Sequence, residues 1–230
     1  RGTCYLTDFD HLPATYVECA GFSKVSTDKV AYAKATRLQM DNQDPVTGQI
    51  VVQKQKERYL VQNPPAKPLT RKELDNVHSL PYMRRYHPSY DAVGGVPAIK
   101  EVEFSIIQNR GCYGGCNFCA ITMHQGRRVT SRSADSIVAE GERIAAQPNF
   151  KGYIHDVGGP TANFRLPSCK DQMTKGMCQN GKKCLAPHAC SKLLVDHKEY
   201  LSILRRLRQI PKVKKVFIRS GIRYDYLIRD

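Results

Sequence analysis

The stretch RGCYGGCNFCA, residues 110–120, places three cysteines within eight positions and separates the first two by a Gly-Gly pair. This C-x3-C-x2-C spacing presents three thiolates from one short loop, and thiolates are soft ligands suited to iron-sulfur clusters or zinc. Glycines let the backbone of such a loop fold closely around a bulky group. Cys112, Cys116 and Cys119 are therefore candidate ligands of one metal centre.

A disulfide framework is a poor explanation of these cysteines. The chain has nine cysteines, an odd number, and the members of the loop are too close in sequence for comfortable mutual bridging. At 230 residues the chain can bury an ordinary core without disulfides. Thiolates that bind a metal in a reducing compartment fit better.

The sequence predicts neither a membrane span nor a signal peptide. No stretch approaches 18 consecutive apolar residues, and Asp8, Asp10 and Glu18 interrupt the first 30 residues. We therefore expect a soluble, cytoplasmic protein without a membrane partner. The chain starts at Arg1 and stops at Asp230 directly after a strand-like run, which suggests a piece of a longer protein.

Residues 1–98 predict a smaller N-terminal α/β region. Asp28 and the residues before it can cap a helix over residues 31–40, and Thr70 with Glu73 forms a capping box for a short helix. Between these helices, residues 41–68 predict a hairpin that leads into a Pro-rich connector. None of these residues suggests a catalytic role.

Residues 99–230 predict a second, α/β domain with parallel strands. Strand-like runs at residues 101–107, 151–157 and 214–221 alternate with helices that Ser133 and Asp196 can cap. Strand, helix, strand, helix, strand implies parallel pairing with right-handed crossovers. The cysteine loop then follows the first strand at the carboxyl end of the sheet, where α/β proteins place their chemistry.

The three-cysteine loop lacks a local fourth cysteine. The next one, Cys169, lies 50 residues beyond Cys119, so the pattern favours a four-iron cluster with three protein ligands and one open iron. An open iron can bind a substrate. A zinc site completed by His124 is the alternative, although structural zinc sites usually have two separated pairs of ligands.

A second group of cysteines lies in a polar insertion at residues 165–195. Its members are Cys169, Cys178, Cys184 and Cys190, separated by eight, five and five residues. They either bind a second metal, as zinc or an auxiliary iron-sulfur cluster, or are unliganded thiols. The spacing matches no standard zinc ribbon, and His188 is a possible substitute ligand.

The chain is strongly basic, with 36 Lys and Arg against 21 Asp and Glu. A formal charge of +15 attracts polyanions and makes RNA a possible partner. The basic pairs are scattered, however, and few aromatic residues lie between them, so solvated surface charge explains the composition equally well.

Longer motifs identify a resemblance to a known family. The C-x3-C-x2-C loop after the first strand of a parallel βα repeat resembles the signature of the radical S-adenosylmethionine (radical SAM) superfamily, and Phe118 matches its usual aromatic residue. Three segments resemble, in order, the long motifs of the YgiQ-like family: residues 61–127, DVGGPTANF at residues 156–164 and KKVFIRSGIRYDYL at residues 214–227.

The resemblance implies a fold and a set of cofactors. The fold would be the N-terminal half of a partial (βα)6 TIM-like barrel, with three parallel strands readable, preceded by the smaller α/β region. The three loop cysteines would bind a 4Fe-4S cluster, whose open iron chelates the amino and carboxylate groups of S-adenosylmethionine. Electron transfer from a reductant such as flavodoxin or ferredoxin would then cleave the cofactor to methionine and a 5'-deoxyadenosyl radical, which acts on an unknown substrate.

The resemblance also implies cofactor-binding residues beyond the cysteines. Gly158, Gly159 and Pro160 occupy the place of a glycine-rich turn whose backbone meets the methionine amine, although a plain strand-ending turn has the same sequence. The superfamily often has an acidic residue where Pro160 stands, so the amine contact would come from the backbone or from elsewhere. Ser220 and Arg223 follow the third strand and could meet the cofactor's carboxylate or ribose; Arg223 is otherwise an ordinary surface residue.

No catalytic side chain is predicted. His155 and Asp156 are adjacent near the end of the second strand, where alternation lets only one of them point inward, as a polar contact or a proton relay. Because the partial barrel generally has six strands, we expect isolated residues 1–230 to be inactive or poorly active.

Two other function classes stay open. One is a non-catalytic metal-binding or iron-sulfur-binding RNA-interaction module, which would bind RNA with a steep salt dependence. The other is a ferredoxin-like electron carrier, which the lack of a local fourth cysteine disfavours.

Overall fold

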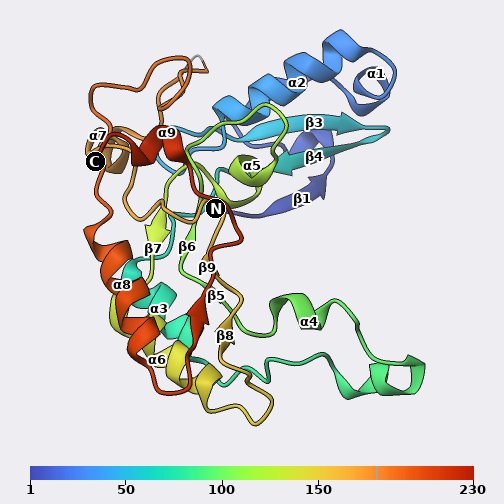
Figure 1. Ribbon diagram of the computed structural model, residues 1–230. Coiled ribbons are helices and arrows are strands. Elements are labelled where there is room, and N and C mark those ends of the chain that lie inside the picture. The colour runs from blue at the N-terminus through green and yellow to red at the C-terminus, as the bar shows by residue number, and fades with distance from the viewer. Residues whose placement is uncertain (180) are drawn as a thin grey trace. The chain divides into compact units, whose positions relative to one another are not determined.

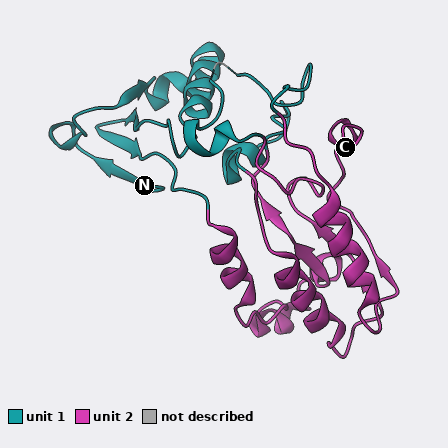
Figure 2. Ribbon diagram, turned by 90° about the vertical axis from the view of Figure 1, so that its left-hand side faces the viewer, with its two compact units in different colours: residues 1–68, 113–128, 169–192 teal, residues 69–112, 129–168, 193–230 magenta. Residues whose placement is uncertain are grey.

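The computed structural model describes residues 1–179 and 181–230, which form two compact units (Figure 2). Unit 1 comprises residues 1–68, 113–128 and 169–192, and unit 2 comprises residues 69–112, 129–168 and 193–230. The cysteine loop therefore begins in unit 2 with Cys112 and continues in unit 1 from Tyr113. The predicted division into residues 1–98 and 99–230 stays a prediction.

Unit 1 is built on a four-stranded sheet with the strand order β1-β4-β3-β2 (Figure 1). β4 pairs antiparallel with β1 and β3, whereas β2 pairs parallel with β3. The predicted hairpin is confirmed, because β3 and β4 pair from Val51↔Gln62 to Gln55↔Arg58. The strands are β1 (Cys4–Thr7), β2 (Val17–Cys19), β3 (Val51–Gln55) and β4 (Arg58–Gln62).

The helices of unit 1 are mostly short. They are the 3-10 helix η1 (Phe9–His11), α1 (Phe22–Val25), α2 (Lys29–Asp41), α5 (Ile121–Gln125) and α7 (Asp171–Lys175). The predicted cap of the long helix α2 is confirmed: the Asp28 carboxylate accepts hydrogen bonds from the N–H groups of Val30 and Ala31, at 2.8 and 3.2 Å. Further along α2, Ala35 packs with Cys19 and Val51 in a small apolar core.

Unit 2 is organised by three parallel strand segments. They are β5 (Ser105–Ile107), the neighbouring strands β8 (Tyr153–Ile154) and β9 (Asp156–Gly158), and β10 (Lys215–Val216). β5 pairs parallel with β9, and β10 pairs parallel with β8. Helices α6 (Ala134–Ala145) and α8 (Lys198–Gln209) lie between successive strands in the sequence. The predicted mixed α/β class with parallel strands is confirmed.

Shorter elements complete unit 2. They are α3 (Arg71–Ser79), the 3-10 helix η2 (Pro88–Val93), α4 (Ile99–Val102), β6 (Asn109–Arg110), its antiparallel partner β7 (Thr130–Ser131) and α9 (Tyr224–Leu227). The predicted capping box is present, since Thr70 Oγ1 accepts from the N–H of Glu73 and the Glu73 carboxylate accepts from the N–H of Thr70. The predicted cap by Ser133 is also confirmed at α6.

Three details of the predicted elements are wrong. The first strand begins at Ser105 because the preceding residues form α4, whose first turn contains N–H bonds back to Val96 and Pro97. The third strand is short, since the Asp156 carboxylate binds the N–H groups of Arg219 and Ser220 in place of a strand partner. The N-cap of α8 is His197, although the Asp196 carboxylate still accepts from the N–H of Lys198 at 2.7 Å.

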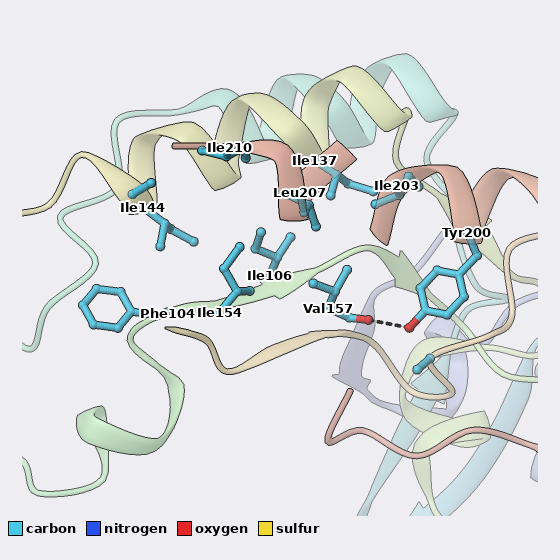
Figure 3. Packing of buried hydrophobic residues seen from close by; sticks show 12 residues of the cluster. Phe104, Ile106, Ile137, Ile144, Ile154, Val157, Tyr200, Ile203, Leu207 and Ile210 are labelled. Carbon is cyan, nitrogen blue, oxygen red and sulfur yellow. Dashed lines mark hydrogen bonds between the residues drawn. The ribbon is translucent and has the colours of Figure 1, made fainter. Parts of the chain in front are cut away.

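The core of unit 2 lies between the two long helices and the parallel strands (Figure 3). Ile137 and Ile144 of α6 and Ile203 and Leu207 of α8 are fully buried against Ile106, Ile154 and Val157 of the strands. A Cβ at Gly141 of α6 would lie 2.5 Å from Leu207, so this glycine permits close packing of the two helices. Leu201 of α8 is 45% exposed and lies on the side of the helix away from this core.

A buried ionic network fixes the chain after β5. Arg132 is fully buried; it pairs with Glu140 of α6 and donates to the carbonyl of Ile107 at 2.9 Å. Burial lowers the pKa of Arg132, and the Glu140 carboxylate opposes that effect. Arg165 in turn donates to the carbonyl of Arg132 at 2.6 Å. Because an unpaired buried charge is costly, this network holds the end of β5 in place.

No helix in the described part of the chain is both long and apolar enough to span a membrane.

Candidate functional site

The three loop cysteines follow β5 and β6 directly in the sequence. Cys112 is nearly buried, with 9% of its surface exposed, whereas Cys116 and Cys119 are half-buried, and none of the three is in a disulfide. Gly111 and Gly115 have φ values of 81° and 63°, in the left-handed region that side chains rarely adopt. The predicted need for glycine in this loop is therefore a backbone requirement.

Cys112 ends the part of the loop that belongs to unit 2. Its Sγ lies 3.5 Å from Oγ1 of Thr161, which follows the glycine-rich turn after β9. Parallel pairing of β5 with β9 brings the two strand ends together, from Ser105↔Asp156 to Ile107↔Gly158. The structure thus confirms that the first cysteine and the glycine-rich turn lie at the same, carboxyl end of the parallel strands.

Cys116 and Cys119 belong to unit 1 and form a turn, in which the N–H of Cys119 donates to the carbonyl of Cys116 at 3.1 Å. Phe118 between them is 93% exposed. Within residues 1–179 and 181–230, no set of three His, Cys, Asp or Glu side chains is arranged to hold a metal. The metal roles of the loop cysteines stay predictions, and three cysteine thiols are a donor set that suits an iron-sulfur cluster.

The glycines of the turn leave no room for side chains. A Cβ at Gly158 would overlap the hydroxyl of Ser220, and a Cβ at Gly159 would overlap the amide oxygen of Asn109. Neither glycine has a positive φ, so space rather than backbone conformation requires glycine here. Pro160 adds neither a polar side-chain atom nor an N–H, so the turn itself offers no side-chain acceptor.

His155 and Asp156 take opposite directions, as alternation along a strand predicts. Asp156 accepts from the N–H of Arg219 at 2.8 Å and from the hydroxyl of Ser220. His155 lies edge-on to Phe104, with ring centroids 5.8 Å apart, and its buried Nδ1 has no hydrogen-bond partner. Ser220 is thus engaged by Asp156, and its predicted contact with a cofactor stays a prediction.

Arg223 forms an ion pair within its own segment. Its Nε donates to Oδ1 of Asp225 at 2.9 Å, and this interaction holds the pKa of Asp225 below its ordinary value. The backbone N–H of Arg223 donates to Oδ1 of Asn163, also at 2.9 Å. Tyr224 is 77% exposed. The predicted role of Arg223 toward a carboxylate or ribose is untested.

Two residues near Cys112 were missed by the sequence analysis. Asn109 in β6 is fully buried, and its Oδ1 has no hydrogen-bond partner. Its Nδ2 donates to the carbonyl of Thr161 at 3.5 Å, while Thr161 Oγ1 meets Cys112. The only sequence signal for Asn109 was its position, as a polar residue just after a predicted strand.

The second group of cysteines belongs to unit 1, as does the later part of the cysteine loop. Residues 169–192, which we call the lysine segment, contact that loop: Lys183 Nζ donates to Oδ1 of Asn117 at 2.7 Å, and Arg127 donates to the carbonyl of Lys182 at 3.1 Å. Asp44, a buried residue, accepts from the N–H of Met177 at 3.0 Å. Folding thus joins three sequence regions within unit 1.

The four thiols of the lysine segment differ in exposure. Cys178 is exposed, and Cys169, Cys184 and Cys190 are half-buried. The N–H of Cys190 donates to the carbonyl of Cys184 at 2.9 Å. A hydrogen bond from Lys192 to Asp171 raises the pKa of Lys192, and the thiols of Cys169 and Cys190 add to this effect. A second metal bound by these cysteines, or by His188, stays a prediction.

Comparisons with known proteins agree with the family resemblance of the motifs. Residues 1–105 match the Radical SAM N-terminal family. Two UPF0313 proteins of Clostridium botulinum, from strains Okra / Type B1 and ATCC 19397 / Type A, are 57% identical to the chain over all 230 residues, which cover 36% of each relative. A UPF0313 protein of Clostridium perfringens strain ATCC 13124 is 54% identical over the same 230 residues, or 35% of its length.

The chain thus spans little more than a third of the curated relatives it matches, with 36% of the length of the Clostridium botulinum proteins covered. The match to the Radical SAM N-terminal family and the high identity to UPF0313 proteins agree with the motifs quoted from the sequence. The chain belongs to the YgiQ-like family of radical SAM proteins, which includes these UPF0313 relatives.

Proposed function

We propose that the full-length protein is a radical SAM enzyme that reductively cleaves S-adenosylmethionine to methionine and a 5'-deoxyadenosyl radical. The observation that carries this proposal is the set of three cysteines, none in a disulfide, that follows the first parallel strand of unit 2 in a chain of the radical SAM family. The further substrate of the reaction is left open. The proposed fold of the full-length catalytic domain is a partial (βα)6 barrel, and the parallel strands of unit 2 are compatible with it.

The donor set of the loop fits a 4Fe-4S cluster. Cys112, Cys116 and Cys119 would hold three irons through soft thiolates, and the fourth iron would be open to the cofactor. When bound, the cluster and S-adenosylmethionine supply the one-electron cleavage of a carbon–sulfur bond. The chain supplies positions for these groups. Exposed Phe118 is available to pack against the cofactor, and Gly158 and Gly159 leave their turn free of side chains.

A reductant must deliver the electron, and the lysine segment suits an acidic protein. Residues 169–192 contain five lysines and one aspartate, and two arginines but no acidic residue lie in residues 113–128. Lys175 and Lys182 are exposed, and Lys182 lies beside the cysteine loop through its contact with Arg127. An acidic flavodoxin or ferredoxin would be steered to this surface by charge.

The basic surface also supports the second candidate, a non-catalytic metal-binding RNA module. The two candidates differ in what they predict for the full-length protein. An RNA module would bind RNA with an affinity that falls steeply with salt concentration and would not cleave S-adenosylmethionine. An enzyme would release methionine and 5'-deoxyadenosine when reduced.

The direct test is a cleavage assay on full-length protein reconstituted anaerobically with iron and sulfide. With a chemical reductant, the wild type is expected to release 5'-deoxyadenosine, and Cys116→Ser is expected to release none. Cys4→Ser, which replaces an exposed thiol of β1, serves as the matched control and should behave as wild type. Absence of 5'-deoxyadenosine from a wild type that binds about four irons contradicts the proposed function.

The same preparations test the second metal. About four irons per chain and no zinc would exclude a second metal in the lysine segment, because one cluster accounts for all four irons. More than about four irons, or one zinc, would support it. The comparison should also include isolated residues 1–230, which we expect to be inactive or poorly active.

A further inference from the structure

Within unit 2, one buried acceptor faces the glycine-rich turn without a partner. Asn109 has no exposed surface, and its Oδ1 accepts no hydrogen bond. Buried polar groups of folded proteins are almost always satisfied, so an orphaned acceptor needs an explanation. A ligand that donates to it is one such explanation.

The position of Oδ1 is set by the turn itself. Any Cβ at Gly159 would overlap Asn109 Oδ1 and would approach the backbone oxygen of Asn109 to 2.9 Å. Gly159 has no positive φ that would require glycine for conformation. The glycine therefore lets the amide oxygen lie directly against the turn backbone.

The same amide is linked to Cys112. Asn109 Nδ2 donates to the carbonyl of Thr161 at 3.5 Å, and Oγ1 of that threonine lies 3.5 Å from the Sγ of Cys112. The bond to Thr161 engages one N–H of the amide, while its oxygen lies against Gly159. All of these residues belong to unit 2.

We propose that Asn109 Oδ1 accepts an N–H from the amino group of S-adenosylmethionine at the Gly158–Gly159 turn. This inference rests on the proposed function. The turn has no polar side chain of its own, because its residues are two glycines and Pro160. An amine whose lone pair is given to iron keeps N–H donors without a full positive charge, so a neutral amide oxygen is a sufficient acceptor.

The carboxylate of S-adenosylmethionine cannot be the group that binds Asn109 Oδ1. A carboxylate only accepts hydrogen bonds, and the orphaned atom also only accepts. An ether oxygen of a ribose fails for the same reason. Among the ligand groups expected near the turn, the amino group donates and has to be matched by an acceptor.

The test compares S-adenosylmethionine with its analogue that lacks the amino group, in equilibrium dialysis with reconstituted full-length protein. Asn109→Leu, which keeps the approximate shape and removes the acceptor, should weaken binding of S-adenosylmethionine about tenfold, the effect of one good hydrogen bond. Its affinity for the deaminated analogue should equal that of wild type. Asn109→Asp keeps an acceptor at the same place and should bind S-adenosylmethionine at least as well as Asn109→Ala does.

Asn163→Leu is the matched control. Asn163 is also a buried amide of unit 2, but both of its ends are bonded to the backbone of Arg223. This variant should lose stability and keep a wild-type preference for S-adenosylmethionine over the analogue. If Asn109→Leu does not take up iron, Asn109→Ala replaces it in the same comparison.

The outcomes separate this inference from the proposed function. Equal affinity of wild type and Asn109 variants for S-adenosylmethionine overturns the role of Asn109 and leaves the enzyme intact. Equal weakening toward both ligands also overturns it, since it indicates a structural effect. If reconstituted wild type binds neither ligand, the proposed function itself fails and the role of Asn109 fails with it.

Discussion

The two groups of cysteines are placed by different kinds of structure. Cys112 follows closely on paired strands of unit 2, and its sulfur meets Thr161, which follows the turn after the neighbouring strand β9. The cysteines of the lysine segment lie in a stretch whose single helix in the described residues is α7, and a buried aspartate in another part of unit 1 binds its backbone. The first group is thus anchored by a sheet, whereas the second depends on loop contacts.

A third kind of cysteine completes the comparison. Cys19 is 2% exposed and packs with Ala35 and Val51. Burial raises the pKa of its thiol, so it is protonated at neutral pH and serves as an apolar packing residue. Position in the fold, rather than residue type, distinguishes candidate ligands from core residues.

The largest effect should come from the cysteines themselves. Cys116→Ser in the full-length protein is expected to abolish cluster assembly, because serine is a poor ligand for iron in such clusters. Cys184→Ser should retain the iron content of wild type if only the loop holds a cluster. Iron and sulfide analysis after anaerobic reconstitution measures the cluster content of both variants. An equal loss of iron in the two variants would contradict the distinction between the two groups of cysteines.

A cavity in the core of unit 2 should be the next largest perturbation. Leu207→Ala removes a fully buried side chain that packs against α6 and should lower the free energy of unfolding by about 2–5 kcal/mol. Leu201→Ala, on the exposed side of the same helix, should cost under about 1 kcal/mol. Denaturant unfolding of both variants gives the difference, and similar losses would show that α8 faces the other way.

The loop contacts of the second group predict a smaller, local effect. Asp44→Ala removes the acceptor of the Met177 N–H and should cost about 1–3 kcal/mol. The same carboxylate also binds the turn at Val46 and Thr47, so part of this loss comes from there. Limited proteolysis should become faster within residues 169–192, and unchanged cleavage there would show that Asp44 does not hold the lysine segment.

Charge reversal tests the proposed reductant surface. Lys175→Glu with Lys182→Glu should slow reduction of the cluster by an acidic flavodoxin about tenfold at low salt, and the difference should shrink as salt rises. Lys24→Glu with Lys29→Glu changes the charge equally at another exposed part of unit 1 and is the control. Stopped-flow reduction kinetics measure the rates, and equal slowing in both pairs would favour net charge over a local surface.

The smallest effect concerns pH. Because the hydrogen bond from Arg223 depresses the folded-state pKa of Asp225, this carboxylate contributes stability above its ordinary pKa of 3.8, and the contribution is lost as pH falls through the lower folded value. A partly exposed pair of this kind contributes about 0.2–1 kcal/mol. Asp225→Asn should therefore lower Tm by about 1–3 °C at pH 7 and by less near pH 3. A difference that grows toward acid pH has the wrong sign for this account.

Local sequence signals gave the elements of this fold correctly where short-range chemistry decides them. The caps at Asp28, Thr70 and Ser133 are examples, since each depends on residues within a few positions. The N-cap of α8 and the helical turn before β5 depended on tertiary packing and were wrong in detail.

The site was only partly predictable for a related reason. The spacing of the cysteines and the glycine-rich turn are visible in the sequence, and parallel pairing places the turn near Cys112. The orphaned oxygen of Asn109 is not visible, because it results from burial and from the bond that Thr161 accepts. Only contacts between distant segments reveal such an atom.

The proposed function requires that the loop cysteines hold a cluster whose open iron binds S-adenosylmethionine. Electron paramagnetic resonance of the reduced, reconstituted full-length protein tests it most directly, with and without S-adenosylmethionine, on wild type and Cys116→Ala. From the proposed function we expect a cluster signal that shifts on addition of S-adenosylmethionine and is absent from the variant. A wild-type signal that S-adenosylmethionine leaves unchanged would contradict the proposed function and favour the metal-binding RNA module.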